Sequence, residues 1–189
     1  GITFCRLVRQ RSNEDWSAAA IRRLAYFLNN HPDPAPGRLN IYRSDEQDPL
    51  GAASPNELCD NAMNCVRGSA ALAVGAVLWD HRDWLPMLTE SIDRVVWDPH
   101  PAVRVAAVDI CLPGLEIRRD LAVKWFVTAA QEDLRVAASG SATAVFNAAI
   151  ETNFEELAPI ILRMCESERD VVAQAGSEEV AARWLFHGM

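Results

Sequence analysis

A short pattern recurs four times along this chain and constrains its fold more than any other feature. Each copy has a small polar or acidic residue, a β-branched residue or Leu, usually an Arg, and then a run rich in Ala and Gly. The copies align on four residues: Val66, Val103, Leu134 and Val171. Their separations of 37, 31 and 37 residues fall in the range of helical repeat arrays. Since one such unit cannot bury its apolar face alone, the pattern predicts an all-α fold, an α-solenoid or right-handed α-α superhelix of helical pairs.

Local signals mark where the expected helices begin and end. The tetrapeptide 54–57, Ser-Pro-Asn-Glu, is a capping box with Pro at the first helical position. Pro101 suits the first turn of the next repeat helix, which we expect to end near Leu112, before Pro113. A further helix is expected over residues 134–150, capped by Asp133. The Ala and Gly residues of these helices, among them Gly140, predict close packing between neighbouring repeats.

The chain is expected to form a single helical-repeat domain over residues 1–189. It has no initiator Met, and its first residues already resemble an amphipathic helix, so we interpret it as a fragment of a longer protein. Residues 30–53 interrupt the repeats with several Pro and Gly residues and no helical periodicity, which predicts a long irregular loop. Ordering against the helices, disorder and a binding role all stay open for this loop, which contains Tyr42 in a short stretch suited to an extended conformation.

Charge separates the classes of partner. The formal net charge is −8, and residues 132–189 carry 4 basic and 10 acidic side chains. A nucleic-acid-binding solenoid needs a basic stripe to neutralise phosphates, so the acidic C-terminal part argues against nucleic acid. The N-terminal segment, with its several Arg residues, keeps DNA as an alternative. The apolar runs are too short to span a bilayer, and no membrane association is expected.

The sequence offers binding candidates but no catalytic constellation. Arg67, Arg104 and Arg135 recur at one repeat position, where they suit either an anionic ligand or an inter-repeat ladder of hydrogen bonds with nearby acids. Trp184 and Phe186 lie near the end of the chain, where they either are covered in a longer protein or expose an apolar patch. No phosphate loop, catalytic triad or metal-ligand spacing is present, so neither a cofactor nor a metal is expected.

The cysteines indicate the compartment. All five, Cys5, Cys59, Cys65, Cys111 and Cys165, are scattered and form no metal-binding pair. Most lie among apolar residues of expected helices, where a free thiol behaves as a small hydrophobic group. This usage is typical of a reducing compartment and predicts a cytoplasmic protein.

Two of the repeat copies carry a family resemblance. Residues 103–107, Val-Arg-Val-Ala-Ala, and 134–138, Leu-Arg-Val-Ala-Ala, resemble HEAT and armadillo-like repeats, in which such a pattern opens the second helix of a pair. The fourth copy departs by placing Val172 where Arg is expected. Residues 30–34, Asn-His-Pro-Asp-Pro, together with residues 64–71 resemble the C-terminal repeat region of bacterial STAND-type signalling NTPases, several of which act in antiviral defence.

These observations favour a non-enzymatic scaffold that binds a protein or senses a target, with oligomers formed through exposed solenoid ends. The STAND resemblance implies that any nucleotide chemistry lies in a segment outside this chain. The alternative is a HEAT-like DNA-binding protein or DNA glycosylase, which requires a basic groove with an aromatic-flanked carboxylate.

Overall fold

The fold is all-helical, as the repeat pattern predicts. The computed structural model describes residues 1–39 and 48–187, with side chains described as far as residue 183. Over these residues the backbone forms eleven α-helices and one 3-10 turn and no β-strand. They are α1 (Ile2–Gln10), α2 (Ala18–Asn30), α3 (Pro49–Ala52), α4 (Pro55–Met63), α5 (Val66–Asp80), the 3-10 turn η1 (Arg82–Trp84), α6 (Leu85–Val95), α7 (Pro101–Ile117), α8 (Arg119–Ala130), α9 (Gly140–Ala149), α10 (Phe154–Cys165) and α11 (Asp170–His187).

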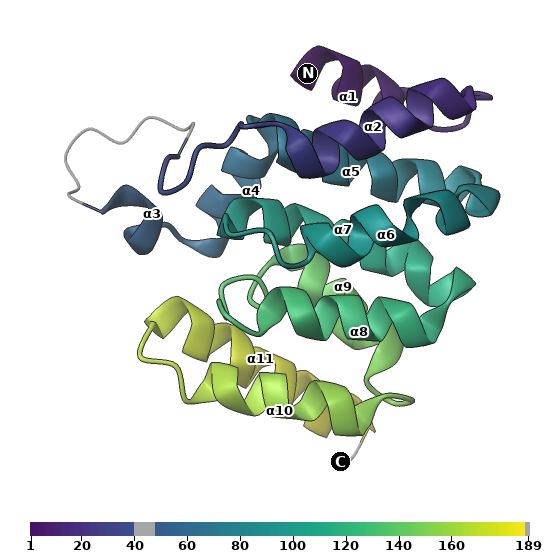
Figure 1. The fold of residues 1–189 in the computed structure, drawn as a ribbon. Helices are drawn as coiled ribbons and strands as arrows, with labels where there is room; N and C mark the ends of the chain where they lie inside the picture. The colour runs from purple at the N-terminus through teal and green to yellow at the C-terminus, as the bar shows by residue number, and fades with distance from the viewer. Residues whose placement is uncertain (40–47, 188–189) are drawn as a thin grey trace.

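The helices are stacked in the order of the chain, from the N-terminus at the top of Figure 1 to the C-terminus at the bottom. One layer contains α2, α6, α8 and α10, and a second layer behind it contains α1, α5, α7 and α9. Within the second layer α5 packs most extensively against α7. Both helices are buried along most of their length, so they form the centre of the hydrophobic core.

Helix starts follow the expected capping chemistry. The Oγ of Ser54 accepts a hydrogen bond from the N–H of Glu57, and the Glu57 carboxylate accepts one from the N–H of Ser54, which completes the capping box of α4. Pro101 is the first residue of α7, and Nδ1 of His100 accepts the N–H of Ala102. The capping box and the Pro101 start are confirmed.

Small residues allow close helix contacts at some expected positions and not at others. A β-carbon on Gly75 of α5 would lie 3.0 Å from the carbonyl oxygen of Asp109 in α7, and one on Gly176 of α11 would lie 2.7 Å from the backbone N of Cys165. Gly140 is exposed and a β-carbon there would meet nothing within 4 Å. The prediction of close packing at Gly140 is therefore wrong.

Two predicted helix boundaries are also wrong. The helix α7 does not end near Leu112 but continues through Pro113 to Ile117. Because Pro113 has no N–H, the carbonyl of Asp109 lacks its usual donor four residues later, and this oxygen lies against Gly75. Residues 134–139 form turns rather than the first part of a helix, and α9 begins at Gly140 with Ser139 as its cap.

No single described helix is long and apolar enough to cross a membrane. By length and composition the pair α4 and α5 passes the same test together, and these two helices are bent by 88° relative to each other.

Candidate functional site

Arg67 connects two successive levels of the stack. Its Nε and Nη2 donate to the two carboxylate oxygens of Asp98, at 2.8 and 3.1 Å, and both side chains are buried. Its Nη1 donates to the carbonyl oxygen of His31 at 2.8 Å. This bidentate pair is the kind of inter-repeat hydrogen bond that the recurring Arg predicts.

Arg135 binds both an acid of its own turn and the segment before α4, which contains the short helix α3 within the loop that was expected to be irregular. Its Nε and Nη2 donate to the Asp133 carboxylate, with Nη2 2.6 Å from Oδ2. Its Nη1 lies 2.7, 3.1 and 2.9 Å from the carbonyl oxygens of Leu50, Gly51 and Ala53. Burial raises the pKa of the Asp133 carboxyl, but the hydrogen bonds and charge of Arg135 outweigh it, so that pKa is lowered overall.

Arg104 is placed between these two pairs. It is 7 % exposed, and its Nε is buried with no hydrogen-bond partner in the described part of the chain. Burial lowers the pKa of its guanidinium, while the charges of Asp133, Glu132 and Asp98 act in the opposite direction. The three recurring Arg side chains therefore differ: two of them bind groups of this chain, and the Nε of the third is unsatisfied.

The contacts of Arg67 and Arg135 belong to a larger arrangement, in which residues 31–39 and 48–54 run across the ends of the stacked helices. We call these residues the strap. The N–H groups of Val66 and Arg67 donate to the side chain and the carbonyl of Asp33, at 2.7 and 3.1 Å. Nε2 of His100 lies 2.9 Å from the carbonyl oxygen of Arg38. Nη1 of Arg169 donates to the carbonyl oxygen of Gly51 at 3.0 Å.

Figure 1 shows this part of the chain along one edge of the stack, beside the ends of α5 and α7. Of the alternatives left open for residues 30–53, the described parts are ordered against the helices. Their main-chain carbonyls are bound by side chains from successive levels, which gives Arg67 and Arg135 a structural explanation. The position of Tyr42 lies outside the described residues, and so do the side chains of Trp184 and Phe186.

A groove separates α9 from α11. It consists of two adjoining cavities of about 310 and 210 Å3 that share Ala138, Ala175 and Glu178 in their walls. One cavity extends to the start of α4 at Ser54, and the other extends to Arg183. We call this feature the α9–α11 groove. Sequence analysis missed it because the predicted helix over 134–150 would have covered α11.

A buried ion pair lies in the wall of the α9–α11 groove. Arg183 and Glu179 are 7 % and 6 % exposed, and Nη1 of Arg183 lies 2.5 Å from a carboxylate oxygen of Glu179. Nη2 of Arg183 donates to Oδ1 of Asn147 at 3.1 Å, and its Cζ lies 5.9 Å from the ring centre of Phe146. Nε of Arg183 has no hydrogen-bond partner among the described residues.

A different, apolar pocket of about 240 Å3 lies between α10 and α11. Its walls are almost entirely aliphatic or aromatic, and they include Phe154, Leu162 and Val180. These three side chains are 52 %, 60 % and 46 % exposed. Together they form an exposed apolar surface at the C-terminal end of the stack, which we call the α10–α11 pocket.

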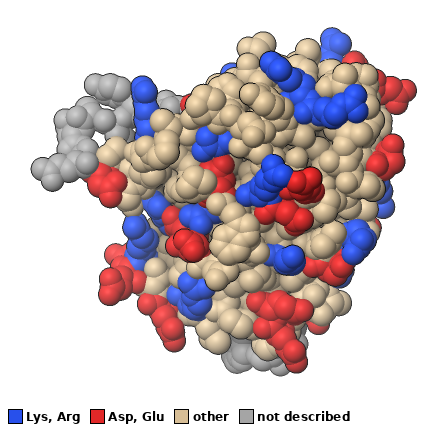
Figure 2. Space-filling model, viewed as in Figure 1, with Lys and Arg blue, Asp and Glu red and all other residues tan. Residues whose placement is uncertain are grey.

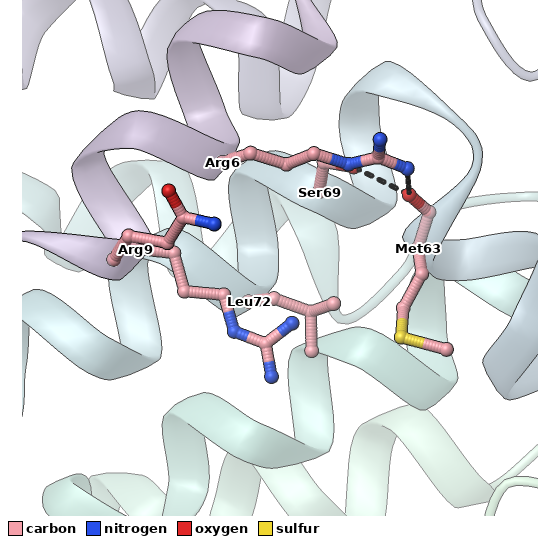
Figure 3. Close-up of a pocket in the computed structure, with 6 residues that line it drawn as sticks. Arg6, Arg9, Met63, Ser69 and Leu72 are labelled. Atoms are coloured by element: carbon pink, nitrogen blue, oxygen red, sulfur yellow. Dashed lines mark hydrogen bonds between the residues drawn. The ribbon is translucent and has the colours of Figure 1, made fainter.

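The most voluminous of the described cavities, about 480 Å3, lies between α1 and α5 (Figure 3). Arg6 donates from Nη2 to the carbonyl oxygen of Met63 at 3.0 Å, and Oγ of Ser69 donates to the same oxygen at 3.1 Å. Figure 3 shows the Arg9 side chain extending along the other side of this cavity. Figure 2 shows basic side chains over the N-terminal helices at the top of this view, basic and acidic side chains interspersed over its middle, and acidic side chains near its lower edge.

The buried thiols and the Asp109 carboxyl have pKa values that are shifted by burial. Burial raises the pKa of the Cys5 and Cys59 thiols to about 11 and that of Cys65 to about 12, so these thiols stay protonated at neutral pH. Burial also raises the pKa of the Asp109 carboxyl, although it accepts a hydrogen bond from Ser141. Among the described residues, no group of three or more His, Cys, Asp or Glu side chains is arranged to hold a metal ion.

Comparison of the chain with protein-family models, with curated proteins and with solved structures found no match.

Proposed function

We propose that this protein is a non-enzymatic protein-interaction module built of HEAT-like helical pairs, which stack as a right-handed α-solenoid. The repeat spacing and the stacking of helices in chain order support this architecture. The five free cysteines suit a reducing compartment such as the cytoplasm.

The α10–α11 pocket is the observation that carries the proposed function. Large apolar side chains that are half exposed and lie together mark interaction surfaces, because covering them with a partner removes apolar area from water. Phe154 and Leu162 are one such pair on α10, and Val180 extends the surface onto α11. A concave apolar pocket of this kind suits an aliphatic or aromatic side chain that projects from a partner protein.

The test compares proteins captured by the immobilised chain with those captured by Leu162→Asp. A carboxylate at this exposed position destroys the apolar surface without burying a charge. Partners that bind the wild type are expected to be lost with Leu162→Asp and retained with Met87→Asp, a matched change at an exposed apolar residue of α6. Equal capture by all three proteins would show that the pocket does not bind the partner.

The alternative, a HEAT-like DNA-binding protein, is favoured by Arg6 and Arg9 at the cavity between α1 and α5. Titration of labelled duplex DNA at low salt separates the two functions, because phosphate contacts weaken steeply as salt rises. Micromolar or tighter binding there would overturn the interaction-module assignment.

The resemblance to STAND-type NTPases extends the proposal to the parent protein, in which this module would sense a target. The full reading frame of the gene tests this extension. An upstream phosphate-binding loop would support it, and a complete frame without one would contradict it.

A further inference from the structure

We propose that the α9–α11 groove is a second binding site, which takes an extended peptide segment that carries a Lys or Arg side chain. It lies on the α9 side of α11, whereas the α10–α11 pocket lies on the α10 side, and of the residues that line the two only Arg183 is shared.

The groove exists because the third repeat copy departs from the others. Residues 134–139 form turns, so α9 has only 10 residues, whereas α7 has 17 and α11 has 18. One side of α11, which includes Ala175, Glu178 and Ala182, therefore faces a cavity rather than a neighbouring helix. Several of the residues that line it are small, among them Ala138, Gly140 and Ala175, so the main chain of a ligand can approach both helices closely there.

The polar groups of the groove suit a peptide main chain. Thr143, Asn147 and Gln174 offer hydroxyl and amide groups that both donate and accept hydrogen bonds. Arg183, which is more than nine-tenths buried, lines the same cavity with an Nε that has no partner. A buried donor without an acceptor costs free energy. This Nε is itself covered, so a peptide carbonyl in the groove reaches it only when the Arg183 side chain turns toward the ligand.

The charge of the groove favours a basic ligand. Arg183 is neutralised by Glu179, which leaves Glu178 as the exposed charge in the wall. Glu178 accepts a hydrogen bond from Gln174 through one of its carboxylate oxygens only, at 2.8 Å. The surrounding residues 132–189 carry 10 acidic and 4 basic side chains, so the wider field attracts a cation and repels an anion.

The experiment measures binding of a short fluorescein-labelled peptide of alternating Ala and Arg by fluorescence anisotropy, with a peptide of alternating Ala and Glu as comparison. We expect the Arg peptide to bind and the Glu peptide not to bind. Glu178→Lys should weaken binding about tenfold or more, because it replaces an attraction by a repulsion inside the groove.

Glu168→Lys is the matched control, since it makes the same change of net charge at an exposed acid outside the groove. If the acidic C-terminal part attracts the Arg peptide without a specific site, the affinity for that peptide should fall equally in both variants. That result would overturn the proposal. Thr143→Trp, which fills the groove from an exposed position on α9, should also abolish binding while circular dichroism stays unchanged.

Leu162→Asp separates this site from the proposed function. It should leave the affinity for the Arg peptide unchanged, whatever it does to partner capture. If instead Leu162→Asp removes peptide binding and Thr143→Trp does not, the peptide occupies the α10–α11 pocket and the groove assignment is wrong.

Discussion

Gly68→Ala is expected to destabilise the protein, although Ala is a better helix former than Gly. Gly68 lies in the first turn of α5, directly against the end of α4. A β-carbon at this position would lie 2.4 Å from the carbonyl oxygen, 2.7 Å from the Cα and 2.9 Å from the carbonyl carbon of Ala62. These are main-chain atoms, so no side-chain rotation relieves the overlap, and the end of α4 has to move away.

The magnitude follows from two opposing terms. Overpacking of a tight contact costs about 1–3 kcal/mol, whereas replacing Gly by Ala inside a helix gains roughly 0.5–1 kcal/mol. The net expectation is a loss of up to about 2.5 kcal/mol in the free energy of unfolding. For a chain of this size that loss lowers the melting temperature by up to about 10 °C.

Gly140→Ala is the matched control, because a β-carbon at Gly140 would meet nothing within 4 Å. Here only the gain applies, and the melting temperature should rise by about 1–4 °C. Thermal melts followed by far-ultraviolet circular dichroism measure both changes. If Gly68→Ala melts at or above the wild-type temperature, the close approach of α4 and α5 is not as the structure has it.

Three further predictions concern Arg135, His100 and the buried thiols. Arg135→Ala removes the partner of the buried Asp133 and the donor to three strap carbonyls. Unfolding in urea should therefore show a free energy of unfolding that is lower by about 3–5 kcal/mol. Arg163→Ala, at an exposed position on α10, should change this free energy little. Burial lowers the pKa of His100 from its ordinary value of 6.5, so its contribution to stability should be complete above that pH and should decrease as the pH falls from there toward the lowered pKa. Urea midpoints at several pH values should show this loss in the wild type, and His100→Asn, which cannot titrate, should show less of it. The thiols of Cys5, Cys65 and Cys111 are buried and protonated, so a thiol reagent at mildly alkaline pH should modify them only after denaturant is added, and rapid modification of these three in the native protein would contradict their burial.

Local signals in the sequence predicted local structure well. The capping box at Ser54 and the start at Pro101 depend on neighbouring residues only, and both are present. The predicted end of α7 before Pro113 was wrong, because whether the helix continues past this proline depends on a residue far away in the chain. Gly75, which has no β-carbon, leaves room for the Asp109 carbonyl beside α5, at the turn where Pro113 stands inside α7.

The strap contacts and the α9–α11 groove could not be predicted from local sequence patterns, because they depend on residues far apart in the chain. The recurrence of Arg67 and Arg135 was evident in the sequence, and so were nearby acids such as Asp98 and Asp133. Their other acceptors are main-chain oxygens, which leave no signature in residue type. The carbonyls bound by Arg135 lie 82–85 positions earlier in the chain. The α9–α11 groove likewise follows from Leu134 lying in a turn, and the pattern at that residue is the same as in copies that form helix.

Because the strap is attached through its main-chain oxygens, its residues can change in evolution while the helix residues that donate to it stay the same. Selection for the attachment acts on His100, Arg135 and Arg169, which supply the donors, whereas a carbonyl is present whatever side chain stands at Arg38 or Leu50. Apart from Asp33, whose side chain caps α5, and Ser54, whose side chain caps α4, the contacts described here impose little on residue identity in the strap. The strap is therefore the part of this protein where sequence can diverge, or be rewritten by an engineer, while its path over the helices is kept.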